Sequence, residues 1–123
     1  MRRIVMTLAV GAIGVLVARP AAAQAEGENV TLTASVIDLS CNLVNNASGD
    51  EHRVCAQTCA DKGQPLALMT ADGEIYMPVN GGMGADGENA RLREFAEQEV
   101  TVTGKVIDRG GMKAIVIESL AGA

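Results

Sequence analysis

Two long runs of β-forming residues near the end of the chain constrain its fold more than any other feature. Residues 100–107 and 112–120 are rich in Val, Ile and Thr and flank the turn Arg109-Gly110-Gly111, a pattern typical of a β-hairpin. Gly104 lies in the middle of the first run, where a strongly coiled strand would bend. The sequence therefore predicts a hairpin of two long strands, the first of them curved.

Three further strands are expected upstream of this hairpin. Residues 30–39 alternate in hydropathy and then change phase, which suggests a bulge or a bend that serves two sheet faces. Residues 66–70 and 74–79 flank Ala71-Asp72-Gly73 and predict a second hairpin. Pro78 places the later of these strands near an edge or close to its own end, because proline cannot donate a ladder hydrogen bond.

A short helix is expected over residues 51–62, between the first and the second of these three strands. Ser48 and Glu51 have the spacing of a capping box, and Asp50 is an alternative N-cap. Gly63 supplies the stop signal. The helix is preceded by a segment, residues 41–49, that we expect to be a polar loop.

A second short helix is expected over residues 89–98, with Asn89 as its cap, after a Gly-rich loop at 80–88. The resulting order is strand, helix, two strands, helix, two strands. Five strands with a helix between the third and fourth form the OB-fold, a partly open Greek-key barrel. The first helix is then an insertion between the first two strands. An α+β sheet of another topology is the alternative.

The N-terminal segment, residues 1–25, is typical of a secretory signal peptide. Two arginines precede an apolar stretch at 4–18, and Ala23-Gln24-Ala25 offers the small-x-small pattern for cleavage before Glu26. A single membrane anchor is the alternative, but glycines, Arg and Pro interrupt the stretch before it reaches the ~20 residues that a spanning helix needs. We expect a single OB-fold-like domain at residues 26–123.

Charge and aromatic content limit the partners of this domain. Loss of the leader removes three arginines and no acid, so the formal net charge falls from -5 to -8. The only aromatic residues are Tyr76 and Phe95. An acidic chain with so few aromatics is a poor binder of nucleic acid or of an anionic membrane, whereas cations and basic partners remain compatible. A domain of 98 residues also has a marginal hydrophobic core, which a disulfide or a bound metal ion would stabilise as a cross-link.

All the cysteines and the only histidine fall within the inserted segment: Cys41, His52, Cys55 and Cys59. The last three are spaced i, i+3, i+7, so on a helix they lie along one side. Cys41, at the end of the first strand, can reach the same side across the loop. Three sulfurs and one imidazole make a complete tetrahedral ligand set for Zn(II) and also suit Cu(I). The segment therefore predicts a metal site.

Disulfide formation is the alternative interpretation of these cysteines, because exported proteins most often use cysteine pairs as structural bridges. Cys41 with either Cys55 or Cys59 would attach the inserted helix to the barrel, and Cys55 with Cys59 is the third pairing. Any pairing leaves one thiol spare. A reactive or thiol-exchange role is a third interpretation, although the spacing is not that of a Cys-x-x-Cys motif.

Two further patterns carry little functional weight. Gly82-x-Gly84-x-x-Gly87 has the spacing of a dinucleotide loop, but that site needs a parallel βαβ unit. Asp86 and Glu88 would also repel a pyrophosphate, so we interpret the segment as a flexible loop. No Ser/His/Asp set is credible with a single histidine and no nucleophile elbow, and no catalytic residue is predicted.

The inserted segment and its flanking motifs resemble a group of small exported bacterial OB-fold proteins. In that group a Cys after the first strand precedes the pattern His-x-x-Cys-x-x-x-Cys. The matching stretches in this chain are Cys41, His52 to Cys59, Lys62-Gly63-x-Pro65, Asp72 to Tyr76, and Val100 to Val106. The resemblance covers nearly the whole predicted domain and implies the fold and a periplasmic setting, without an activity.

These observations predict a periplasmic or secreted, non-enzymatic protein that coordinates Zn or Cu through Cys41, His52, Cys55 and Cys59. The expected partner is a metal ion or a periplasmic protein, not nucleic acid. No stable membrane insertion is expected after the leader is cleaved. The alternative function is a disulfide-stabilised OB-fold module that binds a protein or a ligand without metal.

Overall fold

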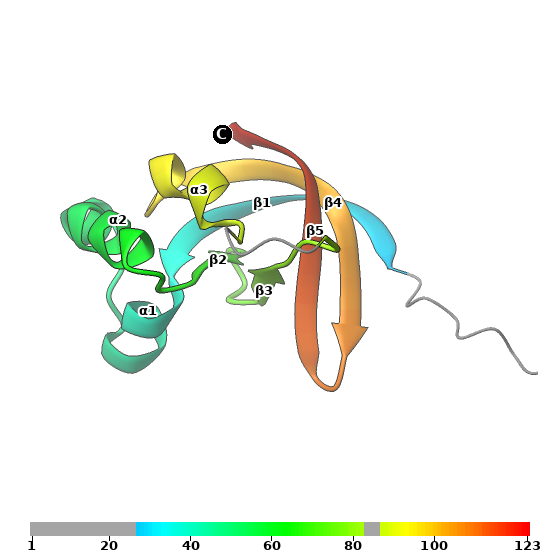
Figure 1. Ribbon diagram of the computed structural model, residues 1–123, viewed down its shortest axis with the longest axis horizontal. Coiled ribbons are helices and arrows are strands. Elements are labelled where there is room, and N and C mark those ends of the chain that lie inside the picture. Colours follow the sequence, from blue (N-terminus) through cyan, green and yellow to red (C-terminus); the bar gives the residue numbers. More distant parts are fainter. Residues whose placement is uncertain (1–26, 83–86) are drawn as a thin grey trace, which may run out of the picture.

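The computed structural model describes residues 27–82 and 87–123, so the predicted leader and part of the Gly-rich loop lie outside it. Five strands form a closed barrel with the order β1-β2-β3-β5-β4 (Figure 1). They are β1 (Glu28–Asp38), β2 (Leu66–Met69), β3 (Ile75–Pro78), β4 (Glu99–Arg109) and β5 (Met112–Gly122). Neighbouring strands are antiparallel except β3 and β5, which pair in parallel. This arrangement confirms the predicted five-stranded OB-fold-like barrel.

The helices lie between β1 and β2 and between β3 and β4, as predicted. They are α1 (Leu39–Asn45), the 3-10 turn η1 (Asp50–His52), α2 (Arg53–Asp61), α3 (Asn89–Leu92) and the 3-10 turn η2 (Arg93–Phe95). Figure 1 shows α1 and α2 together at one end of the barrel, far from the turn that joins β4 to β5. The inserted segment therefore forms a separate helical layer at this end.

Helix α1 corrects the prediction of a polar loop at 41–49. It forms because the Asp38 carboxylate caps it, with Oδ1 accepting from the Cys41 N–H at 3.0 Å. The helix ends at Asn46, whose φ of 53° is left-handed. The predicted capping of the next helix was also wrong, because η1 begins after Gly49 without a side-chain cap.

The hairpin of β4 and β5 confirms the most constraining sequence feature. Gly110 and Gly111 have φ values of 62° and 80°, which suits a tight turn between twisted strands. The β4–β5 register shifts between Thr103 and Gly104. A Cβ atom on Gly104 would overlap the carbonyl oxygen of Val116. The glycine is therefore required where β4 bends and β5 approaches it closely.

The phase change of β1 has a specific cause. This strand pairs with β4 over Glu28 to Ser35 and with β2 over Ser35 to Asp38, without a register shift in either ladder. At its end, Val36, Ile37 and Asp38 are all buried, because the strand has the barrel core on one face and contacts α1 and α2. Consecutive buried residues thus mark the point where the helical layer covers the barrel.

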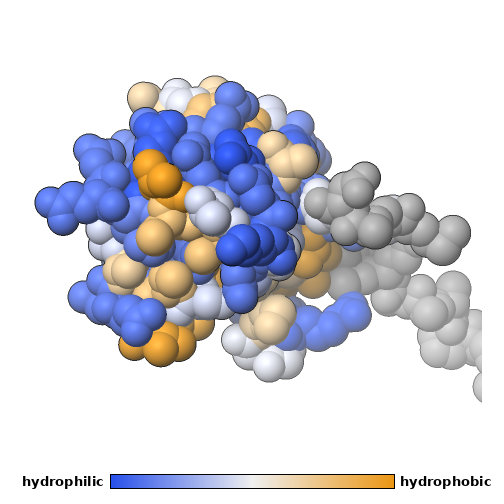
Figure 2. All heavy atoms as spheres, turned by 60° about the vertical axis from the view of Figure 1, so that its left-hand side comes forward, coloured by the Kyte–Doolittle hydropathy of each residue, from blue (hydrophilic) through white to orange (hydrophobic). Residues whose placement is uncertain are grey.

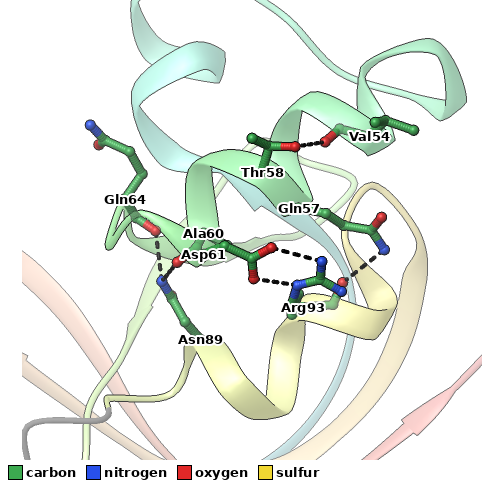
Figure 3. A network of polar contacts seen from close by, with 8 residues as sticks. All are labelled: Val54, Gln57, Thr58, Ala60, Asp61, Gln64, Asn89 and Arg93. Atoms are coloured by element: carbon green, nitrogen blue, oxygen red, sulfur yellow. Dashed lines mark hydrogen bonds and ion pairs between the residues drawn. The ribbon is translucent and has the colours of Figure 1, made fainter.

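A polar network attaches α2 to α3 and η2 (Figure 3). The Asn89 side chain accepts from the Leu66 N–H at 3.0 Å and donates to the carbonyls of Ala60 and Gln64 at 3.2 and 2.7 Å. It does not cap α3, contrary to prediction. Arg93 forms a two-pronged ion pair with Asp61, and the contact through Nη2 measures 2.8 Å. The C-terminal end of α2 is thereby fixed against the barrel.

The second helical segment is shorter than predicted. Helix α3 and the turn η2 together end at Phe95, not at Gln98. Glu97 has a φ of 60°, which an L-residue rarely adopts. Its backbone N–H donates to the Val36 carbonyl at 2.7 Å, which compensates for the strained conformation.

Candidate metal centre

Asp38 is a buried carboxylate with one oxygen unused. It lies at the end of β1 with an exposed fraction of 0%. Oδ1 caps α1 through the Cys41 N–H, whereas Oδ2 has no hydrogen-bond partner within residues 27–82 and 87–123. Burial of a carboxylate without compensation is costly, so this oxygen calls for a hydrogen-bond donor or a cation.

Two metal-binding side chains lie beside Asp38. Cys41 on α1 and His52 at the end of η1 each place a ligand atom close to the Asp38 carboxylate, and the three atoms lie within 4.8 Å of one another. The three residues come from the end of a strand, the first turn of a helix and the start of the next helix. Together they form a group that can hold a metal ion.

His52 is oriented by Glu97. The Nδ1 atom of His52 lies 2.9 Å from Oε1 of Glu97, and the side chains are only 14% and 2% exposed. The other carboxylate oxygen of Glu97 accepts from the Gly49 N–H at 2.9 Å. Because Nδ1 is engaged, Nε2 is the ring nitrogen left for a metal. A carboxylate that holds a ligating histidine in this way is the usual outer-shell arrangement of metal sites.

Cys59 and Cys55 differ in their environments. Cys59 on α2 is half-buried, and Asp38 and Cys41 both influence the pKa of its thiol, so it lies near them. Its sulfur is not among the three ligand atoms that lie within 4.8 Å of one another. Cys55, one turn earlier on α2, is exposed and outside the group formed by Asp38, Cys41 and His52. All three cysteines are free thiols, and no disulfide is present in the part of the chain described.

The electrostatics of the thiols favour their protonated form in the absence of a cation. Burial raises the pKa of Cys41 and of Cys59, and the neighbouring Asp38 carboxylate raises both further. Cys41, His52 and Glu97 superficially resemble a nucleophilic triad, but nucleophilic cysteines have lowered pKa values. A bound cation would reverse this balance, since it stabilises thiolate and carboxylate together. The cluster therefore suits metal binding better than nucleophilic chemistry.

Sequence reasoning missed Asp38 and Glu97. Asp38 carries a weak signal, because it directly follows the buried residues of β1 and precedes Cys41 by three positions, the spacing of an N-cap. Glu97 carries none, because it reaches the site only through the fold, 45 positions away from His52. Of the four predicted ligands, the structure brings Cys41 and His52 into one group with Asp38, leaves the half-buried Cys59 outside that group, and leaves Cys55 at the surface.

The remaining sequence patterns are outside this centre. The Gly82-x-Gly84-x-x-Gly87 segment lies partly beyond the described residues. The strand that follows it, β4, pairs antiparallel with both neighbours, so the βαβ unit of a dinucleotide site is not formed by β3 and β4. Among the residues described, no helix has the length and apolar character needed to cross a membrane.

The fold and the site together define a small, mixed five-stranded β-barrel with an Asp/Cys/His group that can hold a metal ion. Comparisons of the chain with protein-family models, with curated proteins and with solved structures found no match. The barrel that the sequence resemblance implied is present, but no family is identified.

Proposed function

We propose that this protein is an exported, non-enzymatic binding protein for one Zn(II) ion. The ligands in this proposal are Asp38, Cys41, His52 and Cys59, with Glu97 positioning the histidine. The observation that carries the proposal is the buried Oδ2 atom of Asp38, which lacks a hydrogen-bond partner and lies in one group with a thiol and an imidazole. A divalent cation would satisfy this oxygen and both thiolates.

The donor atoms favour Zn(II) over Cu(I). Zinc accepts oxygen, nitrogen and sulfur ligands in a tetrahedron, whereas Cu(I) prefers soft sulfur ligands without a carboxylate. The sequence alone offered three sulfurs and one imidazole, which suited both ions. The proposed ligand set contains the buried Asp38 in place of the predicted Cys55. It therefore has one soft sulfur fewer and one hard oxygen more, which favours zinc.

Four protein ligands would close the coordination sphere, as in structural zinc sites. They come from β1, α1, η1 and α2, so a bound ion would attach the helical layer to the barrel. The core of this barrel contains no Trp and little aromatic volume, and such a cross-link is therefore valuable. The leader predicted at residues 1–25 supports a periplasmic or secreted setting, and the acidic domain would attract cations.

Native mass spectrometry of the reduced protein, expressed as the full chain and offered Zn(II), tests the proposal. We expect one bound ion per chain, loss of that ion in Cys41→Ser, and retention of it in the matched variant Cys55→Ser at the exposed position. Equal metal content in the wild type and in a variant with all three cysteines replaced by serine would overturn the proposal.

A disulfide-stabilised interaction module is the second candidate, favoured by the proximity of the Cys41 and Cys59 thiols. It predicts one reactive thiol per chain, that of Cys55, when the exported protein is unfolded without reductant. The zinc proposal predicts three reactive thiols after the metal is chelated. Thiol counting under these two conditions separates the candidates.

A further inference from the structure

Cys55 is the one cysteine of the inserted segment that solvent reaches freely. The groups around the candidate centre are enclosed, with Asp38 at 0% exposure and the side chains of His52 and Glu97 at 14% and 2%. Cys41 and Cys59 are half-buried, whereas Cys55 is exposed. An ion that reaches the centre from solvent, or leaves it, therefore meets a barrier that a surface ligand beside the centre would lower.

The helix places Cys55 directly beside this centre. Cys55 and Cys59 are four residues apart within α2, so their side chains lie on the same side of the helix, about one turn of ~5.4 Å from each other. The exposed Cys55 thiol is therefore a neighbour, on the same side of α2, of the proposed ligand Cys59.

The surroundings of Cys55 leave its thiol free and attract cations. Asp50 and Glu51 are exposed at the start of the same helical segment, and Glu51 precedes Cys55 by one turn. Val54 is 74% exposed, and Figure 2 shows hydrophobic side chains gathered within an otherwise hydrophilic surface on this side of the molecule. Acidic groups beside a thiol raise the local concentration of a divalent cation.

On the basis of the proposed function, we infer that Cys55 is an exchange ligand through which Zn(II) enters and leaves the centre. The Cys55 thiol loses its proton to solvent as its sulfur bonds to zinc. The bond between zinc and Cys59 then breaks, and the freed thiolate takes up a proton. The ion keeps its +2 charge, and no electrons are transferred. The acceptor is a thiol- or chelate-bearing molecule that approaches the exposed side of α2.

The test compares the wild type with Cys55→Ser and with the matched variant Thr58→Ser, which keeps a hydroxyl on the same helix. Each full-length, reduced and zinc-loaded protein is mixed with an excess of a chromogenic zinc chelator, and zinc affinity is measured separately by competition at equilibrium. An adjacent ligand acts at a high effective concentration, so we expect Cys55→Ser to release zinc at least about tenfold more slowly with unchanged affinity. Thr58→Ser should match the wild type.

Two results would overturn the inference. Equal release rates in the wild type and in Cys55→Ser would show that exchange does not use this thiol, while the zinc site itself stands. A large loss of equilibrium affinity in Cys55→Ser would make Cys55 a permanent ligand instead of an exchange ligand. Absence of zinc binding in the wild type would instead refute the proposed function, and with it this inference.

Discussion

Replacement of Asp38 by Asn should change the stability of the protein in opposite directions with and without zinc. Asparagine has the same shape and is an equally good N-cap, so α1 should still begin after residue 38. The substitution removes a buried negative charge whose Oδ2 atom has no hydrogen-bond partner in the described part of the chain. We therefore expect the metal-free variant to be at least as stable as the metal-free wild type.

The size of the zinc effect follows from linkage. At free zinc of about 100 times the dissociation constant, binding stabilises the wild type by about 2.7 kcal/mol. For a domain of roughly 100 residues this raises the melting temperature by about 11–22 °C. Loss of a charged ligand should weaken zinc binding by about 100-fold or more, since removal of an outer-shell partner alone costs about 10–100-fold. At the same zinc concentration the variant then gains only about 0.4 kcal/mol, or roughly 2–3 °C.

The assay is thermal unfolding of the reduced protein followed by circular dichroism, with a chelator and with buffered Zn(II). Asp61→Asn is the matched control, because it makes the same chemical change at a half-exposed carboxylate and should keep the full zinc shift. If Asp38→Asn shows the same zinc-induced shift as the wild type, Asp38 is not a ligand. If the metal-free variant is several kcal/mol less stable than the wild type, Oδ2 is not an uncompensated charge.

Three further predictions test other parts of the structure. Glu97→Gln should weaken zinc binding by about 10–100-fold, because His52 loses the carboxylate that orients it; unchanged affinity in a chelator competition would contradict this role. Gly104→Ala should lower the free energy of unfolding by about 1–3 kcal/mol in urea, because the added methyl group overlaps the facing strand β5, and an unchanged urea midpoint would refute the close approach. The hydrogen bond to Arg93 lowers the pKa of Asp61, so this ion pair stabilises the protein above the ordinary carboxyl pKa of about 3.9, and its contribution is lost as the pH falls through the lowered value. Between about pH 5 and pH 2, the free energy of unfolding in urea should therefore fall less for Asp61→Asn than for the wild type. The difference should be small, because both side chains of the pair are half exposed. An identical fall would show that the pair contributes nothing.

The barrel could be predicted from the sequence because its signals are local. The alternation in residues 100–107 and 112–120 and the glycines between them specify the hairpin without reference to the rest of the chain. The order of strands and helices then left few topologies to consider, and the OB-fold order was among them. Even the phase change in β1 was visible, although its cause, burial on both faces, required the structure.

The candidate site was predicted only in part, because some of its contacts join residues that are far apart in the sequence. Cys41, His52 and Cys59 are conspicuous by residue type and spacing in one short segment. Glu97 and the end of β1 meet this segment only after the barrel closes, and the amide of Asp38 lies 3.5 Å from the Glu97 carboxylate across 59 positions of sequence. Helix α1 was missed for a related reason, since its cap is a strand residue that is also part of the site.

X-ray absorption spectroscopy at the zinc edge is the most direct test of the proposed four-ligand zinc site. For the reduced wild type loaded with one equivalent of Zn(II), we expect two sulfur neighbours at about 2.3 Å and two nitrogen or oxygen neighbours at about 2.0–2.2 Å. Asp38→Asn should alter the nitrogen and oxygen shell and leave the sulfur shell unchanged. A shell of three sulfurs and one nitrogen, or a zinc ion surrounded only by oxygen, would contradict the assignment of Asp38, Cys41, His52 and Cys59 as the ligands.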